Sequence, residues 1–148
     1  IGKKIKAAED ASRLLIEQQE AGYDFIKVHM GLCRTVYDAA ARTSTERRIP
    51  FVAHVTAEAG LQRALELGQP TIGHLNAYWP ALVRDDANGT DVDYGLLGAP
   101  PTPFLDEAKF AALAEATRQA GVWNVPTLSI GRIVQRPATG PSKEHSLF

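Results

Sequence analysis

Three polar residues occupy comparable places in three short apolar segments of this sequence. Lys27 lies in "FIKV", His54 in "VAHV" and His74 in "TIGHL". Each segment follows a turn marked by Gly or Pro and has the composition of a buried β-strand. If the three strands are parallel neighbours, their carboxyl ends meet at one edge of the sheet, and we expect the three side chains to converge there.

A lysine and two histidines at one point could hold a metal ion. Burying an unpaired ammonium in an apolar strand is unfavourable by several kcal/mol, so we expect Lys27 to be neutralised or paired. A depressed pKa would make its amine nucleophilic, whereas carboxylation by carbon dioxide would turn it into a carboxylate-like metal ligand. Neutral imidazoles at His54 and His74 suit Zn²⁺ or a similar ion.

Each of these residues also has an ordinary structural interpretation. A single histidine in a strand is commonly a hydrogen-bonded core or surface residue, and a strand lysine commonly points to solvent at a sheet edge. The metal-site hypothesis therefore depends on the joint pattern of Lys, His and His over consecutive strands, not on any one residue.

The elements that would position these residues alternate along the chain. Apolar periodicity and terminal glycines predict helices over 7–21, 35–48, 57–67 and 106–120. Strands are predicted within 23–31, 51–55, 71–75 and 122–128. Strands separated by helices imply parallel pairing with right-handed crossovers, so the predicted fold class is α/β with parallel β/α units. A long loop, either functional or mobile, is expected between His74 and Asp106.

Length and composition limit the possible functions. The 148 residues carry 16 Lys and Arg against 17 Asp and Glu, and 45% are hydrophobic. We expect one domain over residues 1–130, an irregular tail over 131–148, and no nucleic-acid or membrane partner. The lone Cys33 permits no internal disulfide, and no secretory signal or membrane helix is recognisable, so we expect a soluble cytoplasmic protein. A complete eight-unit β/α barrel needs roughly 200 residues or more, so this chain holds only part of one.

Three segments of the chain are similar to a known family. "AGYDFIKVHMG", "IPFVAHVTAEAGLQRALELGQPTIGHL" and "AGVWNVPTLS" resemble strands four to seven of the amidohydrolase superfamily, in the branch of imidazolonepropionase-like enzymes and bacterial Xaa-Pro metallo-dipeptidases. The resemblance implies part of a TIM-type (β/α)8 barrel. It also implies that a carboxylated Lys27 bridges two metal ions, and that His54 and His74 bind the second. Gly73 is a departure, because relatives often carry Glu there.

The resemblance implies a metal-dependent amidohydrolase that uses one or two zinc or similar divalent ions. A metal-bound hydroxide would cleave a C–N amide bond in a dipeptide, an N-acyl amino acid or a cyclic amide. Three further residues are candidate substrate contacts, namely His29, Arg34 and Tyr78. The alternatives are solvent exposure for His29, an ordinary surface position for Arg34 and packing for Tyr78.

Part of the family's catalytic apparatus has no counterpart in this sequence. The family's first strand supplies a His-x-His pair and its eighth an Asp that acts as the general base, yet the chain has no His-x-His and no Asp after Asp106. We therefore expect a fragment that is inactive alone and that either self-associates or requires the missing half-barrel. Two other functions stay open: a non-catalytic metal-binding or assembly module, and an open α/β ligand-binding domain.

Overall fold

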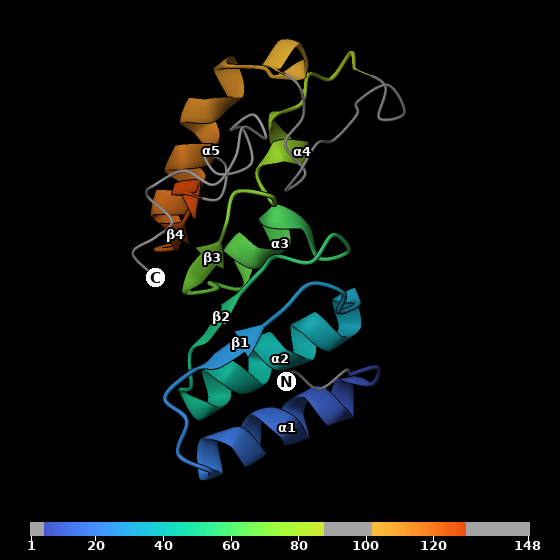
Figure 1. Cartoon of the computed structure of the whole chain (residues 1–148), viewed down its shortest axis with the longest axis vertical. Helices are drawn as coiled ribbons and strands as arrows, with labels where there is room; N and C mark the ends of the chain where they lie inside the picture. The colour runs from blue at the N-terminus through green and yellow to red at the C-terminus, as the bar shows by residue number, and fades with distance from the viewer. Residues whose placement is uncertain (1–4, 88–101, 130–148) are drawn as a thin grey trace, which may run out of the picture.

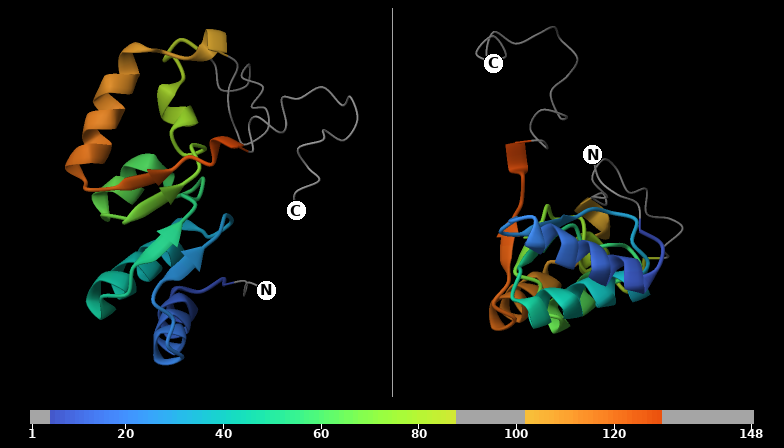
Figure 2. Two further views of the ribbon diagram at one scale, coloured as in Figure 1. Left: turned by 60° about the vertical axis from the view of Figure 1, so that its left-hand side comes forward. Right: turned by 90° about the horizontal axis from the view of Figure 1, so that it is seen from below.

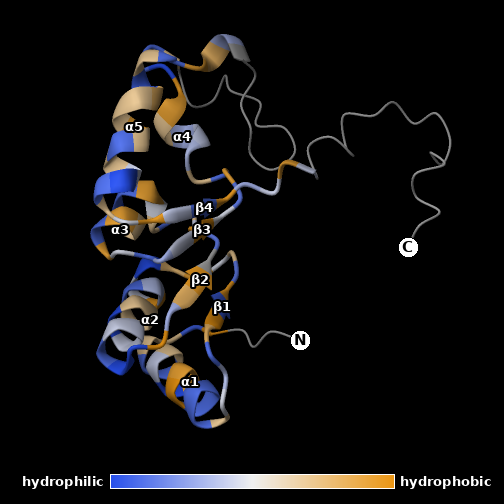
Figure 3. Ribbon diagram, turned by 90° about the vertical axis from the view of Figure 1, so that its left-hand side faces the viewer, coloured by the Kyte–Doolittle hydropathy of each residue, from blue (hydrophilic) through white to orange (hydrophobic). Residues whose placement is uncertain are grey.

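The computed structural model describes residues 5–87 and 102–129, which form a four-stranded parallel sheet with helices against one of its faces (Figures 1 and 3). In chain order the elements are α1 (Ala8–Glu20), β1 (Ile26–Val28), α2 (Arg34–Arg47), β2 (Phe51–Ala53), α3 (Gly60–Glu66), β3 (Thr71–Gly73), α4 (Trp79–Leu82), the 3-10 turn η2 (Thr102–Phe104), α5 (Ala108–Gln119) and β4 (Trp123–Val125). The predicted α/β fold with parallel β/α units is confirmed. In the described part of the chain, no helix is long and apolar enough to cross a membrane.

The strands lie in the order β1-β2-β3-β4, so each connecting helix joins two neighbouring strands (Figure 2). Their register places Lys27, Val52, Thr71 and Trp123 side by side in one row. Because alternate residues of a strand point to opposite faces, this row lies on one face of the sheet. The buried strand residues belong to the other face, which the helices cover: Ile26, Val28, Phe51 and Ile72. We call the face that carries Lys27 the open face.

A buried hydrogen-bonded chain fixes the helix layer against the sheet. The Tyr37 ring on α2 packs edge-on against Phe51, with 5.8 Å between ring centroids. Its hydroxyl donates to Gln69 Oε1, and Gln69 Nε2 donates to the carbonyl of Thr71 at 2.7 Å. Burial raises the pKa of the Tyr37 hydroxyl, so it stays protonated as a donor. The position of β3 relative to α2 is therefore held by polar contacts inside an apolar core.

The element boundaries differ from the sequence prediction in three respects. Each strand is only three residues long, and α2 begins at Arg34, which was predicted to lie in the preceding loop. The predicted loop after His74 contains the short helix α4, and Val83 and Leu105 form an antiparallel bridge. The α4 helix forms because its residues pack into an apolar cluster with β3, a tertiary contact that local periodicity does not show. The predicted tail, 131–148, lies outside the described residues.

An ion pair joins α2 to α3. Arg63 Nε and Nη2 each donate to a different carboxylate oxygen of Asp38 at 3.0 Å, and both side chains are half-buried. The hydrogen bonds from Arg63 hold the pKa of Asp38 below its ordinary value, against the opposing effect of burial.

Removing this carboxylate should destabilise the fold in a pH-dependent way. We expect Asp38→Asn to lower the free energy of unfolding at pH 7 by about 1 kcal/mol, since it removes a charge-assisted pair that solvent only partly screens. A carboxylate whose pKa is lower in the folded chain than in the unfolded chain stabilises the fold at pH values above the unfolded pKa, which is about 3.9 for Asp. The difference from wild type should therefore shrink as the pH falls below that value.

Urea unfolding at several pH values measures this effect. Glu115→Gln is the matched control, because Glu115 pairs with Arg118 three residues away on the exposed side of one helix. Its effect should be smaller than that of Asp38→Asn. A pH-independent loss in Asp38→Asn would show that the ion pair is not the cause.

Candidate functional site

Three histidine rings lie together at the carboxyl ends of β1, β2 and β3. The ring centroid of His54 lies 4.5 Å from that of His29 and 4.5 Å from that of His74. Each histidine is the first residue after its strand, so the sheet edge itself brings them together. We call His29, His54 and His74 the histidine cluster. His54 and His74 were predicted to be metal ligands, and His29 was predicted to contact substrate.

Backbone hydrogen bonds continue the sheet ladder beyond the strands and hold two of these residues. The N–H of His54 donates to the carbonyl of Val28 at 3.2 Å, and that of His74 donates to the carbonyl of Val125 at 2.8 Å. His74 has a φ of 66°, a left-handed conformation that side-chain-bearing residues rarely adopt. This backbone turn directly follows the regular strand Thr71–Gly73.

Lys27 occupies a different place from the one predicted. The register pairs it with Val52, two residues before His54, so Lys27 is not equivalent to the two histidines along its strand. Its side chain is exposed, which corrects the expectation that the ammonium is buried. The reason is that Lys27 lies on the open face, whereas the helices cover the face of Ile26 and Val28. Burial therefore provides no reason for its carboxylation, which remains an expectation from the resemblance.

The surroundings of His54 favour its neutral form. Burial lowers the pKa of His54 most, the charge of Lys27 next, and then those of His74 and His29, to a value of about 4. At pH 7 its imidazole is therefore uncharged and keeps a free lone pair. Within residues 5–87 and 102–129 its Nδ1 has no hydrogen-bond partner, and the carbonyl of Val28 opposes the lowering of the His54 pKa. A neutral imidazole at this position is of the kind that binds metal ions.

The donor set suits a divalent cation only in part. Neutral imidazole nitrogens are ligands that Zn²⁺ accepts, and the unpartnered Nδ1 of His54 fits such a role. Within residues 5–87 and 102–129, however, no three His, Cys, Asp or Glu side chains are arranged to hold one metal ion. A site built on His54 and His74 thus needs a further donor, for which carboxylated Lys27 is the candidate in this chain.

The two other predicted substrate contacts lie elsewhere. Tyr78 is 7% exposed, and its hydroxyl lies 3.0 Å from Thr117 Oγ1, so the packing alternative describes its position between α4 and α5. Arg34 is exposed at the start of α2, where its backbone N–H donates to Glu58 Oε2 at 3.4 Å. In the described part of the chain, no hydrogen bond or ring contact joins either residue to the histidine cluster.

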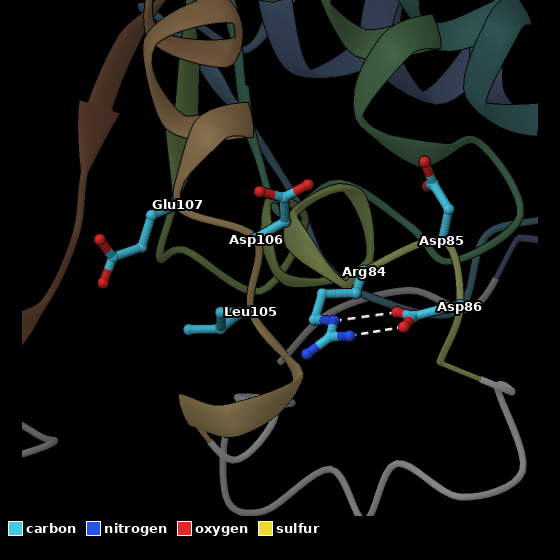
Figure 4. A pocket seen from close by; sticks show the side chains of 6 residues that line it. All are labelled: Arg84, Asp85, Asp86, Leu105, Asp106 and Glu107. Atoms are coloured by element: carbon cyan, nitrogen blue, oxygen red, sulfur yellow. Dashed lines mark hydrogen bonds and ion pairs between the residues drawn. The ribbon is translucent and has the colours of Figure 1, made fainter.

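A surface hollow of about 490 Å³ lies away from the strand ends, near the start of α5. Figure 4 shows the residues that line it: Arg84, Asp85, Asp86, Leu105, Asp106 and Glu107. Arg84 pairs with Asp86, and Asp85 receives a hydrogen bond of 2.6 Å from Lys109 Nζ. With two of its carboxylates already paired and no histidine in its wall, this hollow is not the candidate site.

Comparison with known proteins supports the fold assignment. No protein-family model matches the sequence, and no curated protein matches it. Among solved structures, a Xaa-Pro dipeptidase with methionine bound in its active site is 16% identical, with a TM-score of 0.55 over 88% of this chain. The chain therefore shares its fold with part of a Xaa-Pro dipeptidase.

This chain spans 28% of the length of that dipeptidase. A bottromycin amidohydrolase is also similar, at 24% identity and a TM-score of 0.47, covering 77% of this chain and 21% of the other. The resemblance to Xaa-Pro dipeptidases that the sequence predicted is confirmed at the level of the fold. The assignment of the chain to part of a TIM-type β/α barrel is confirmed with it.

Proposed function

We propose that this chain contributes His54 and His74 as metal ligands to a hydrolase of amide C–N bonds. The observation that carries the proposal is the contact between two imidazoles at the carboxyl ends of adjacent parallel strands, of which the buried His54 is neutral at pH 7. Active sites of β/α barrels lie at this edge of the sheet. The fold shared with part of a Xaa-Pro dipeptidase supports an amide substrate, such as a dipeptide, an N-acyl amino acid or a cyclic amide.

The residues of the chain have separate roles in this proposal. A bound divalent ion such as Zn²⁺ would polarise the substrate carbonyl and lower the pKa of water. His54 and His74 provide nitrogen ligands from backbone positions fixed by the sheet ladder. Lys27 lies on the open face, close enough for its charge to act on His54, and is the third ligand when carboxylated. His29 is exposed while its ring contacts His54, so it can touch a substrate.

Loss of either His54 or His74 should weaken zinc binding. We expect His54→Ala and His74→Ala each to lower zinc affinity by at least about tenfold. Even the loss of a residue that only hydrogen-bonds to a metal ligand usually lowers affinity by about that factor. Competition against a chromophoric chelator measures the affinity, and circular dichroism checks the fold. Cys33→Ser is the control, because the Cys33 thiol lies beside Thr35 at the start of α2.

If both histidine variants bind zinc as well as the wild type does, the metal proposal fails. The histidines would then be structural, as in an open α/β ligand-binding domain. Zinc binding that is lost in both variants but unchanged in Cys33→Ser supports the site.

The zinc-loaded 148-residue chain should not hydrolyse dipeptides or N-acyl amino acids. Positioning of the reacting groups is worth roughly 7 to 11 kcal/mol of barrier, and the sequence offers neither a His-x-His pair nor an Asp after Asp106 to complete the site. Chromatography of product amino acids after incubation with Xaa-Pro and other dipeptides provides the measurement.

Joining this sequence to strands that carry both features should produce turnover that His54→Ala abolishes. Zinc binding without turnover in that longer protein would favour a non-catalytic metal-binding module. Zinc-dependent turnover by the 148-residue chain alone would place the base within it, and His29 would be the first residue to replace.

The open face carries the apolar surface that a partner would cover. Phe25, Trp123 and Val125 are 56%, 76% and 56% exposed, and in the part of the chain that the structure describes no strand pairs with the outer edge of β4. We therefore propose that a second copy or further barrel strands pack here. Light scattering should show self-association of the 148-residue chain, which Trp123→Lys reduces. Phe110→Lys, which adds the same charge on helix α5, should not reduce it. A concentration-independent monomer would contradict this proposal.

A further inference from the structure

The end of β4 holds both the backbone and the ring of His74. Thr127 Oγ1 lies 2.7 Å from His74 Nδ1, and the same hydroxyl donates to the carbonyl of Val125 at 3.1 Å. That carbonyl also accepts the backbone N–H of His74 at 2.8 Å. One threonine thus connects the imidazole to the strand that already anchors the histidine backbone.

The two contacts of Thr127 share a single hydroxyl proton, and a carbonyl oxygen can only accept. When that proton goes to Val125, the Thr127 oxygen accepts, and the proton of the second contact comes from His74 Nδ1. A neutral imidazole protonated on Nδ1 keeps its lone pair on Nε2, the atom then available to a metal ion.

We propose that Thr127 is a positioning residue that fixes His74 in the Nδ1–H form and orients its Nε2 for a metal ion. That the ligand of Nε2 is a metal ion rests on the proposed function. Both residues have a left-handed backbone, with φ values of 66° at His74 and 56° at Thr127. Such conformations persist in side-chain-bearing residues only where surrounding contacts determine them. Here the contacts are the hydrogen bonds that join the two residues through Val125.

The tautomer of His74 tests the proposal without any metal. Long-range ¹H–¹⁵N spectra of the metal-free chain above pH 8 should show His74 as the Nδ1–H form. Thr127→Val removes the hydroxyl and should shift the population toward Nε2–H, whereas Thr127→Ser should keep the wild-type form. Finding Nε2–H in the wild type, or the same tautomer in Thr127→Val, would overturn the inference.

Zinc affinity provides the second measurement. Thr127→Val should weaken binding by about 10- to 100-fold, as loss of an outer-shell hydrogen bond does, and Thr127→Ser should restore it. Thr45→Val is the matched control, because its hydroxyl donates to the Ala41 carbonyl within α2. A wild-type chain that binds no zinc would refute the proposed function, while the spectra would still decide the role of Thr127. Equal zinc affinity in wild type and Thr127→Val would show that Thr127 does not position a ligand.

Discussion

The parallel pairing of β1, β2 and β3 is the constraint on which the candidate site depends. Each strand has only three residues, yet the ladder continues past the strand ends through the amides of His54 and His74. A shift of one residue in any pairing would move a histidine to the opposite face of the sheet. The buried contacts among Tyr37, Gln69 and Thr71 oppose such a shift of β3, because breaking them would leave polar groups in an apolar core.

Helices cover only one face of the sheet, and this affects the electrostatic environment at the carboxyl ends of the strands. Helices bury the face of Ile26 and Val28, while Lys27 stays exposed on the other face. The exposed ammonium retains its hydration, and its charge helps to lower the pKa of the buried His54. One strand therefore supplies both a packed face for the core and a positive charge that adds to the effect of burial on the neighbouring His54.

Local sequence patterns were sufficient for the order of the four strands and the four longer helices, and for part of the site. Gly and Pro punctuation located the strands, and His54 and His74 follow apolar runs, so their meeting could be predicted. The exposure of Lys27 could not, because it depends on what covers the second face of the sheet. The contact of Thr127 with His74 joins residues 53 positions apart and leaves no periodic signal in the sequence. Tyr78 was equally ambiguous, since aromatic residues line pockets and fill cores alike.

The two central histidines are not equivalent, and the difference bears on how a ligand would affect the fold. The Nδ1 of His74 already has Thr127 as a partner, whereas the buried Nδ1 of His54 has none among the residues that the structure describes. An unsatisfied buried nitrogen destabilises the folded chain, typically by about 1–3 kcal/mol. A ligand that pairs with this nitrogen removes that cost and binds only the folded state, where the two rings are close. A ligand bound at His54 would therefore also stabilise the strand ends.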